Sequence, residues 1–209
     1  MHENVRIMAT LKDKFKKWKE SRSSWQKALD VTFWLLLILL ILPGPRKTIS
    51  IVVNKVVLNV KNPSMKREEK QVTLTDLDYG WVLADGKGTP YYMSDLRGTV
   101  IFLNFWATWC PPCVAELPEI QKAYEKHGNE VAFLLVANQE PSVVEEFMEK
   151  HGYSFPVFYP GTAAPKVFES RAIPTTYIIS PDGVIVTKKT GAANWDSRAT
   201  AKIFRQLVK

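Results

Sequence analysis

The sequence predicts an α/β domain, with a mixed central sheet flanked by helices, that follows a basic arm and a short apolar segment. Between residues 71 and 209, apolar β-branched stretches alternate with segments of helical pattern, as is typical of α/β folds. Positive charge gathers before this region. Residues 1–70 carry 15 Lys or Arg against 6 Asp or Glu, whereas residues 71–209 carry 13 against 15.

Residues 1–30 form a basic arm whose apolar residues recur at three- and four-residue spacing. This pattern predicts an amphipathic helix lying on the cytoplasmic face of a membrane. A solvated arm whose apolar residues align by chance is the alternative. Because nucleic-acid binding needs a basic patch on the folded surface and the folded part is slightly acidic, we expect no binding of nucleic acid.

Residues 31–45, VTFWLLLILLILPGP, carry no charge and would form a helix of roughly 22 Å. That is shorter than the hydrocarbon core of a bilayer, about 30 Å. The sequence that follows lacks the small-x-small pattern of signal cleavage, so we favour an uncleaved transmembrane signal anchor over a signal peptide or a buried core helix. Membrane lipid is therefore an expected partner of residues 1–45.

The orientation of this anchor follows from the charge on its two sides. Basic residues are more numerous before it than after it, and the positive-inside rule then places residues 1–30 in the cytoplasm and the remainder outside. Residues 46–70 are expected to form a spacer. Their first half is strand-like and their second half is polar.

The domain at 71–209 begins with a predicted hairpin, whose strands lie around residues 81–84 and run through 92. Residues 99–107 are almost wholly apolar, as expected of a central strand buried on both faces. A helix is predicted over 111–127, closed by Gly128.

The second half of the domain continues the alternation. A buried strand is predicted over 130–138, a helix over 141–151 and a hairpin over 175–189. A last amphipathic helix is predicted from about residue 194 to 208. This order predicts a mixed sheet with helices on both of its faces.

The only two cysteines, Cys110 and Cys113, lie in the segment WCPPC between the central strand and the first long helix. A structural zinc site needs four ligands, and His2, His127 and His151 do not have the spacing to supply the other two. We therefore expect no metal. A purely structural disulfide is a weaker alternative, because a loop of two residues constrains little of the unfolded chain.

A redox couple agrees best with this position. At a helix N-terminus, the dipole and the free N–H groups favour the Cys110 thiolate, which is the nucleophilic form. Pro111 and Pro112 then occupy the first turn, where an N–H has no partner within the helix. Cys113 lies further along the buried face and is expected to be the resolving thiol.

The segments FWATWCPPC, CVAELPEI and AIPTTYIISPDG resemble the TlpA/ResA-like family of the thioredoxin superfamily, whose members are membrane-anchored thiol-disulfide oxidoreductases. The resemblance covers roughly residues 71–209. It implies a thioredoxin-like fold with an N-terminal β-hairpin extension, and no cofactor besides the Cys110–Cys113 disulfide. It also implies disulfide-bearing client proteins outside the cytoplasm, cytochrome c biogenesis being one setting, and a membrane electron donor.

The resemblance also assigns roles to four further residues. It implies a cis peptide bond at Pro174, with Ile173 and Pro174 exposing a backbone edge to the substrate. It implies that Glu116 moves the proton of the buried cysteine and that Trp109 shields the nucleophile. Asn104 stands where thioredoxins carry a buried aspartate, and an amide cannot accept a proton, so that task falls to Glu116 or to water.

The function expected is therefore an enzyme that reduces client disulfides, held by a single span in a bacterial cytoplasmic membrane with its catalytic domain outside. A thiol peroxidase with an antioxidant role is one alternative. It is disfavoured because Leu103 and Ala107 stand where peroxiredoxins need a proline and a threonine. A redox-linked module that binds a client without turnover is the other.

Overall fold

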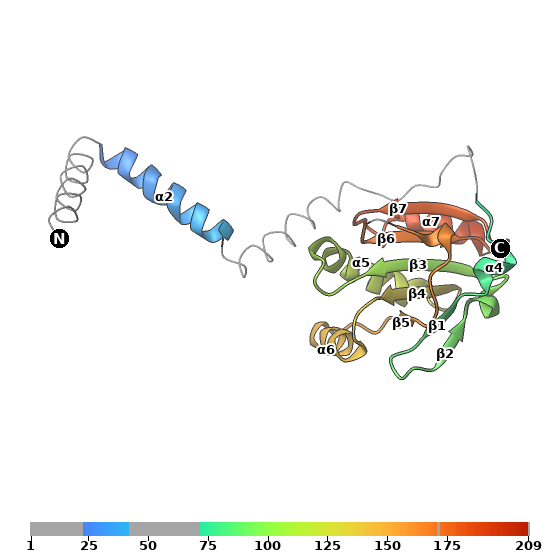
Figure 1. The fold of residues 1–209 in the computed structure, drawn as a ribbon. Coiled ribbons are helices and arrows are strands. Elements are labelled where there is room, and N and C mark those ends of the chain that lie inside the picture. The colour runs from blue at the N-terminus through green and yellow to red at the C-terminus, as the bar shows by residue number, and fades with distance from the viewer. Residues whose placement is uncertain (1–22, 42–71, 171, 209) are drawn as a thin grey trace. The chain divides into compact units, whose positions relative to one another are not determined.

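The computed structural model describes residues 23–41, 72–170 and 172–208, and the chain divides into two compact units, 1–48 and 49–209. In the first unit, α2 (Ser24–Ile41) is a single helix (Figure 1). Within the described residues, no helix combines the length and the apolar character needed to cross a membrane. Most of the predicted arm, the end of the predicted anchor and all of the predicted spacer lie outside the described residues.

The second unit contains a seven-stranded mixed sheet with the order β2-β1-β5-β4-β3-β6-β7. The strands are β1 (Val82–Ala84), β2 (Pro90–Tyr92), β3 (Val100–Trp106), β4 (Val131–Ala137), β5 (Val157–Pro160), β6 (Thr175–Ile179) and β7 (Ile185–Thr190). The three strands β3, β4 and β5 are parallel, and the others join antiparallel. The predicted hairpin is confirmed as β1 and β2, and it joins the sheet through β5.

Strand β3 lies near the middle of the sheet and separates two apolar cores. Its side chains alternate between them, so that Val100 and Phe102 pack on one side while Ile101 and Leu103 pack on the other. This alternation explains the nearly continuous apolar sequence of the strand, because both faces of a central strand must be covered. The site described below lies where β3 ends.

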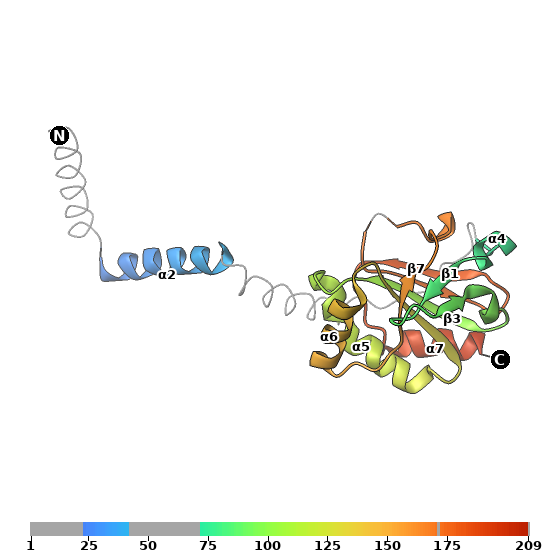
Figure 2. The same cartoon turned by 60° about the horizontal axis from the view of Figure 1, so that its bottom comes forward.

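The three long helices of this unit are α5 (Pro111–His127), α6 (Pro141–His151) and α7 (Arg198–Leu207). All three contribute buried side chains to the core that contains Phe102, and Figure 2 shows them along the same side of the sheet. The expected mixed sheet with helices on both faces is confirmed, although the three long helices share one face. The chain steps from β3 to β4 to β5 in one direction, and right-handed crossovers then place α5 and α6 on one face.

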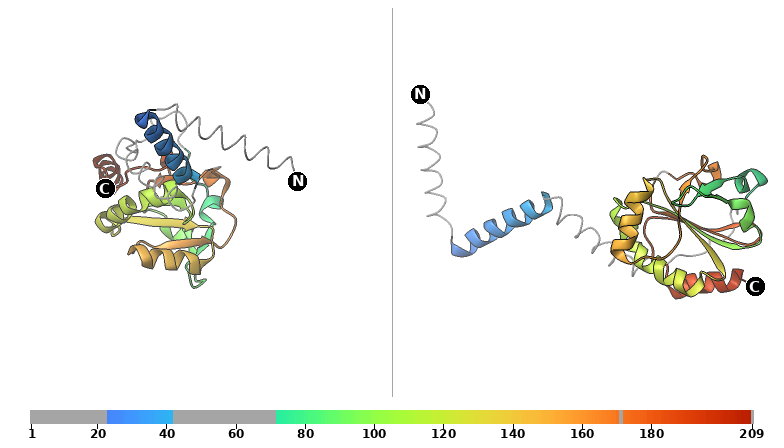
Figure 3. Two further views of the ribbon diagram at one scale, coloured as in Figure 1. Left: turned by 90° about the vertical axis from the view of Figure 1, so that its left-hand side faces the viewer. Right: turned by 90° about the horizontal axis from the view of Figure 1, so that it is seen from below.

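Short helices cover the opposite face. They are α4 (Asp76–Tyr79), η1 (Met93–Leu96) and η2 (Lys166–Phe168), and they supply Tyr79, Met93 and Phe168 to the second core. In the right-hand view of Figure 3, the yellow-green and red long helices α5 and α7 lie below the sheet and the green and orange short segments lie above it. None of these short helices has enough residues to give a clear periodic pattern in the sequence.

The predicted bounds of α5 and α6 are confirmed, and Gly152 ends α6 with a φ of 68°, a conformation that glycine adopts without strain. Helix α7 begins at Arg198 rather than near residue 194. Its N-cap is Ser197, whose side chain accepts the Thr200 N–H. The segment before it is a loop, and that loop reaches the active-site helix.

Candidate active site

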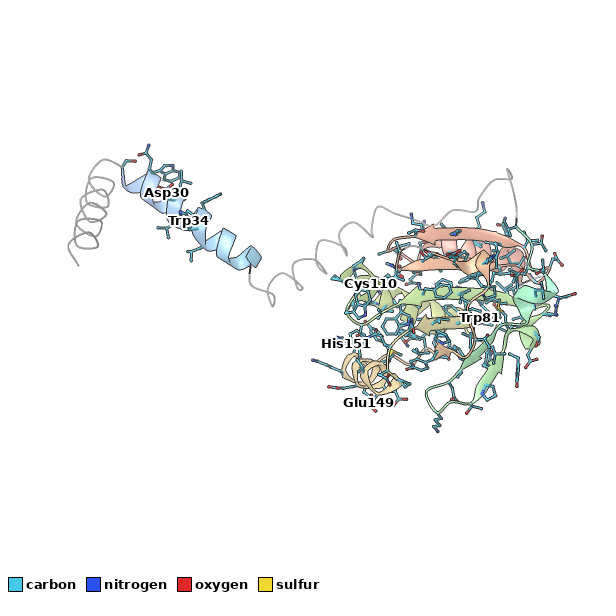
Figure 4. The ribbon with its side chains drawn as sticks, in the orientation of Figure 1. Asp30, Trp34, Trp81, Cys110, Glu149 and His151 are labelled. Carbon is cyan, nitrogen blue, oxygen red and sulfur yellow. A yellow bond between two sulfur atoms is a disulfide. The ribbon has the colours of Figure 1, made fainter. Side chains whose placement is uncertain are left out.

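Cys110 and Cys113 form a disulfide, with their Cα atoms 5.2 Å apart. Strand β3 ends at Trp106 and α5 begins at Pro111, so the pair lies at the junction between a buried strand and a helix. Cys110 lies at the end of the domain where α5 begins, the same end as His151 of α6 (Figure 4). Cys110 is 3% exposed and Cys113 is fully buried, in the order expected of an attacking and a resolving thiol.

Cys110 is the N-cap residue of α5, as the sequence predicts. Its Sγ accepts the backbone N–H of Cys113 at 3.3 Å, while Pro111 and Pro112 fill the first two helical positions. A sulfur held at the N-terminus of a 17-residue helix is in the environment that stabilises a thiolate. The Cys113 N–H is the one donor of the first turn that the prolines leave for it.

The Ile173–Pro174 peptide bond is cis, which is the geometry that the family resemblance implied. The carbonyl oxygen of Ile173 lies 3.7 Å from Cys110 Sγ, so the loop before β6 directly adjoins the disulfide. Pro174 is buried and Ile173 is half-buried. The structure therefore brings these two residues to the cysteine pair although more than 60 residues separate them in the sequence.

Glu116 is fully buried and receives three hydrogen bonds, one from β3 and two from the loop before α7. Asn104 Nδ2 on β3 donates to Oε1 at 2.9 Å. On Oε2, the Ala193 backbone N–H donates at 3.0 Å and Trp195 Nε1 donates at 2.9 Å. The carboxyl group is thus satisfied on both oxygens, one helical turn beyond Cys113.

Burial raises the pKa of Glu116 to about 7, against the opposing effect of the hydrogen bonds from Trp195, Ala193 and Asn104. Burial disfavours the charged form, and donors to the carboxylate favour it. A group with a pKa near the working pH exchanges protons readily in both directions. Glu116 is the one described residue of this site with the properties of a proton carrier.

Asn104 connects Glu116 to the neighbouring strand. Its Nδ2 also donates to Thr176 Oγ1 at 2.8 Å, because Asn104 and Thr176 are directly opposite each other in the β3–β6 register. Its Oδ1 is buried and has no partner in the structure. The amide therefore organises the carboxyl group of Glu116 without being able to take up a proton.

Trp109 is 65% exposed and lies beside an apolar cleft of about 450 Å³. Trp81, Phe105, Trp109 and Ile173 are among its lining residues, and none of the described residues that line it is charged. Trp81 stacks on Phe105, with ring centroids 6.0 Å apart. A second cleft, of about 470 Å³, shares Phe105 and Ile173 with the first and adds Lys166 and Glu169.

Two contacts of the site were not predicted from the sequence. Trp195 lies in a segment that was expected to be helical and Ala193 just before it, and no local pattern indicates that they reach Glu116. Gln139, after β4, exchanges two hydrogen bonds with Thr108: the Thr108 N–H donates to Oε1 at 2.8 Å, and Nε2 donates to Thr108 Oγ1 at 3.0 Å. This pair fixes the loop two residues before Cys110.

In the part of the chain that the structure describes, no group of three or more His, Cys, Asp or Glu side chains has the arrangement of a metal site. His127 and His151 both lie in the last turn of their helices. His151 stacks on Phe147 with a centroid distance of 4.2 Å, and His127 packs against Phe204. The rings of both described histidines thus pack against aromatic side chains.

The sequence matches the Redoxin family over residues 71–206. It is 33% identical over 132 residues to the thiol-disulfide oxidoreductase ResA of Halalkalibacterium halodurans, a match that covers 62% of this chain and 73% of that protein. It is 34% identical over 114 residues to ResA of Bacillus subtilis, covering 53% of this chain and 64% of that protein.

The solved structures to which this chain is similar support its fold but carry no information about its activity. A DsbF homologue from Corynebacterium diphtheriae superposes with a TM-score of 0.52 at 16% identity, over 68% of this chain and 90% of that one. The exposed lipoprotein thioredoxin Etrx1 from Streptococcus pneumoniae gives a TM-score of 0.50 at 24% identity, over 61% of this chain and 98% of that one. The architecture described above is therefore that of a thioredoxin-like fold.

Proposed function

This chain belongs to the Redoxin family and is a thiol-disulfide oxidoreductase, and we propose that it reduces disulfides of client proteins outside the cytoplasm. The observation that carries this proposal is the Cys110–Cys113 disulfide at the N-terminus of α5, bordered by the Ile173 carbonyl. We further propose that the site works without a bound cofactor. Both electrons then come from the two cysteine sulfurs.

In the proposed reaction, the Cys110 thiolate attacks one sulfur of the client disulfide and the other client sulfur leaves as a thiolate. Cys113 then loses its proton to Glu116 and attacks Cys110 Sγ, which releases the second client thiolate. The client disulfide gains two electrons and, from solvent and Glu116, two protons. The protein is left with the Cys110–Cys113 disulfide, and an electron donor in the membrane is proposed to reduce it again.

The surroundings of Ile173 support binding of an extended client segment. Its backbone adjoins Cys110 Sγ, so a client strand beside it would bring its own cysteine to the nucleophile. The apolar cleft lined by Trp81 and Trp109 lies on this surface and would accept an apolar client side chain. Trp109, at 65% exposure, is placed to cover that side chain rather than to bury the cysteine by itself.

For location, we propose a single membrane span at residues 31–45, with residues 1–30 in the cytoplasm, residues 46–70 as a spacer and the catalytic domain outside. The charge-free sequence and the excess of basic residues before it support this arrangement. The two cysteines are the only ones in the chain. After reduction, intact cells treated with a membrane-impermeant maleimide should therefore label the protein, and the absence of labelling would place the domain inside.

Reduction of client disulfides is tested with the full-length chain in detergent, using insulin as the substrate and measuring the redox potential of the cysteine pair. Dithiols of this kind span about −270 to −120 mV, and the proposal expects a value toward the reducing end. A potential near −120 mV, with net oxidation of reduced clients, would overturn it.

The two alternative activities predict different results. A thiol peroxidase needs a polar site around its cysteine, but Leu103 and Ala107 are both buried apolar residues. Peroxide consumption that survives Cys113→Ser would nevertheless favour it. A client-binding module would keep its cellular role in the Cys110→Ser variant, although insulin reduction would be lost.

A further inference from the structure

Hydrogen-bond donors contact both carboxyl oxygens of Glu116. The groups that face its carboxyl are the amide of Asn104 from β3, and the Ala193 backbone N–H and the Trp195 indole from the loop before α7. On its own helix, Cys113 lies one turn earlier. The nearest acidic residue of the loop, Asp196, is paired with Lys126. The three contacting groups are neutral, and each donates a hydrogen to a carboxyl oxygen.

We infer that Trp195 is a positioning residue for Glu116, which holds the carboxylate ionised and fixed in orientation so that it can receive the Cys113 proton. This inference rests on the proposed function, in which Glu116 accepts that proton. Trp195 itself supplies no reacting group. It acts only through the bond from its Nε1 to Glu116 Oε2.

The chemistry of the indole explains the effect. An indole N–H donates and never accepts, so it bonds to a lone pair and offers nothing to a carboxyl proton. Three donors and no acceptor among the contacting groups stabilise the ionised carboxylate over the neutral acid. Without them, burial alone would keep Glu116 protonated at neutral pH, and it could not take up the proton of Cys113.

The packing of Trp195 fixes the direction of this donor. The side chain is 1% exposed, and its ring meets Phe102 of β3 edge-on, with centroids 5.1 Å apart and planes at 83°. Since the ring is enclosed in the core, the N–H keeps its direction when the cysteine pair changes state. A surface side chain in the same position would lose this orientation to water.

The first experiment follows titration by NMR in the oxidised full-length protein. The Trp195 indole N–H resonance of the wild type should shift with pH near 7 together with the Glu116 carboxyl carbon. In Trp195→Phe the pKa of Glu116 should rise by about one to two units, as expected when a hydrogen bond to a charged group is lost. A Trp195 indole resonance of the wild type that does not shift between pH 5 and 9 would overturn the inference. This holds even if the variant does not fold.

Trp106 provides the matched control. It is equally buried, and its Nε1 has no partner in the structure, so Trp106→Phe also removes an indole from the core but no donor from Glu116. The pKa of Glu116 should stay unchanged in this variant. An equal rise in both variants would show that loss of core volume, rather than loss of the N–H, is responsible.

The second experiment measures the resolving step with 5,5′-dithiobis(2-nitrobenzoate), whose second thiolate is released when Cys113 attacks the mixed disulfide on Cys110. At pH 7, about half of Glu116 is ionised in the wild type and roughly a tenth in Trp195→Phe, so release should slow about fivefold. The rate should recover at higher pH, which a purely structural defect would not permit.

A double-mutant comparison separates this inference from the proposed function. In a Glu116→Gln background, Trp195→Phe should cause no further slowing, and the same slowing in that background would overturn the inference. If the wild type does not reduce insulin, the proposed function fails, whereas the NMR titration still decides whether Trp195 controls Glu116.

Discussion

The turn that holds the two cysteines and the buried network that holds Glu116 are built in opposite ways. In the cysteine turn, the sulfur of Cys110 is bonded to the amide of Cys113, three residues away. In the network, Glu116 is bonded to residues 12, 77 and 79 positions away. The surroundings of Cys110 are thus set by local sequence, and those of Glu116 by tertiary structure.

This difference predicts how each part responds to mutation. Changes in the cysteine turn should alter the chemistry of the thiols more than stability, because the hydrogen bond in the turn joins residues that are close in the sequence. Changes in the network should alter stability and pH dependence together, because each partner is a buried polar group.

The largest effect is expected from the cysteines themselves. Cys110→Ser should reduce the rate of insulin reduction to that of the uncatalysed reaction, because no nucleophile remains. Cys113→Ser should instead trap a mixed disulfide with the client, visible on a non-reducing gel. Cys110→Ser should unfold within about 1 kcal/mol of the reduced wild type, and Cys113→Ser, which places a hydroxyl in the buried core, should lose about 1–2 kcal/mol. A large loss of stability in either would contradict the view that this turn is energetically local.

The next effect is expected from Glu116. Glu116→Ala leaves one N–H of Asn104 Nδ2 and the N–H groups of Ala193 and Trp195 without an acceptor and should lower the free energy of unfolding by about 3 kcal/mol or more. Glu116→Gln keeps an acceptor oxygen for them, and Asn104 Oδ1, which has no partner, is available to accept from the new amide. The Glu116→Gln variant should therefore lose less free energy of unfolding than Glu116→Ala, as measured by urea denaturation of the oxidised proteins. Equal losses in the two variants would show that the hydrogen bonds contribute little.

The same carboxyl group should make stability depend on pH. Its pKa is raised from 4.5 to about 7 in the folded state, so the folded protein binds more protons than the unfolded chain between these values. Stability should therefore fall as pH rises from 4.5 to 7, by about 3 kcal/mol for this group. The difference in unfolding free energy between wild type and Glu116→Gln should show this slope, and a difference that is flat with pH would contradict it.

A smaller effect is expected from the prolines in the cysteine turn. Pro112→Ala restores an N–H at the second helical position, one of the two that an N-cap side chain normally accepts. The pKa of Cys110 should fall, and the redox potential should become more positive by about 30 mV, because the reduced form is stabilised. Thiolate absorbance and equilibration with glutathione measure the two quantities.

Pro111→Ala is the matched control, because the N–H of the first helical position points less directly at the N-cap side chain. It should shift both quantities less than Pro112→Ala does. If neither variant moves the potential, the two prolines serve only to begin the helix.

The smallest effect is expected from Gln139. Gln139→Ala removes both hydrogen bonds to Thr108 and should lower the free energy of unfolding by about 1–2 kcal/mol, with a modest change in potential. The neighbouring Glu140 is exposed and makes no capping hydrogen bond, so Glu140→Ala should change stability by less than about 0.5 kcal/mol. A change of the same size in both would assign the effect to the loop in general.

The contrast also explains which parts of the site were predictable. Cys110 as N-cap, the prolines in the first turn and the buried Cys113 follow from a strand, a turn and a helix that adjoin in the sequence. Glu116 could be placed on the buried face by its spacing from Cys113. Its partners could not, because the sequence AANWDS before α7 carries no sign of which distant group it will meet.

The elements of the fold also divide into those that the sequence predicts and those that it does not. Strongly periodic elements such as α5 and α6 were predicted with their bounds, and the buried strands β3 and β4 within a residue at each end. The short strand β5 and the helices η1 and η2 were not predicted, since three or four residues carry too little pattern. The start of α7 was predicted too early because apolar Trp195 continues the helical spacing, whereas its side chain in fact serves Glu116.

The separations of 77 and 79 residues between Glu116 and two of its donors also determine the order in which these groups are synthesised. A ribosome extends a chain by about 5–20 residues per second, so both cysteines and Glu116 are synthesised several seconds before Ala193 and Trp195. During that interval a reactive pair exists on a nascent chain whose carboxyl group is still exposed to water. Two of the donors that hold Glu116 are therefore added to the chain after the carboxyl group that they hold.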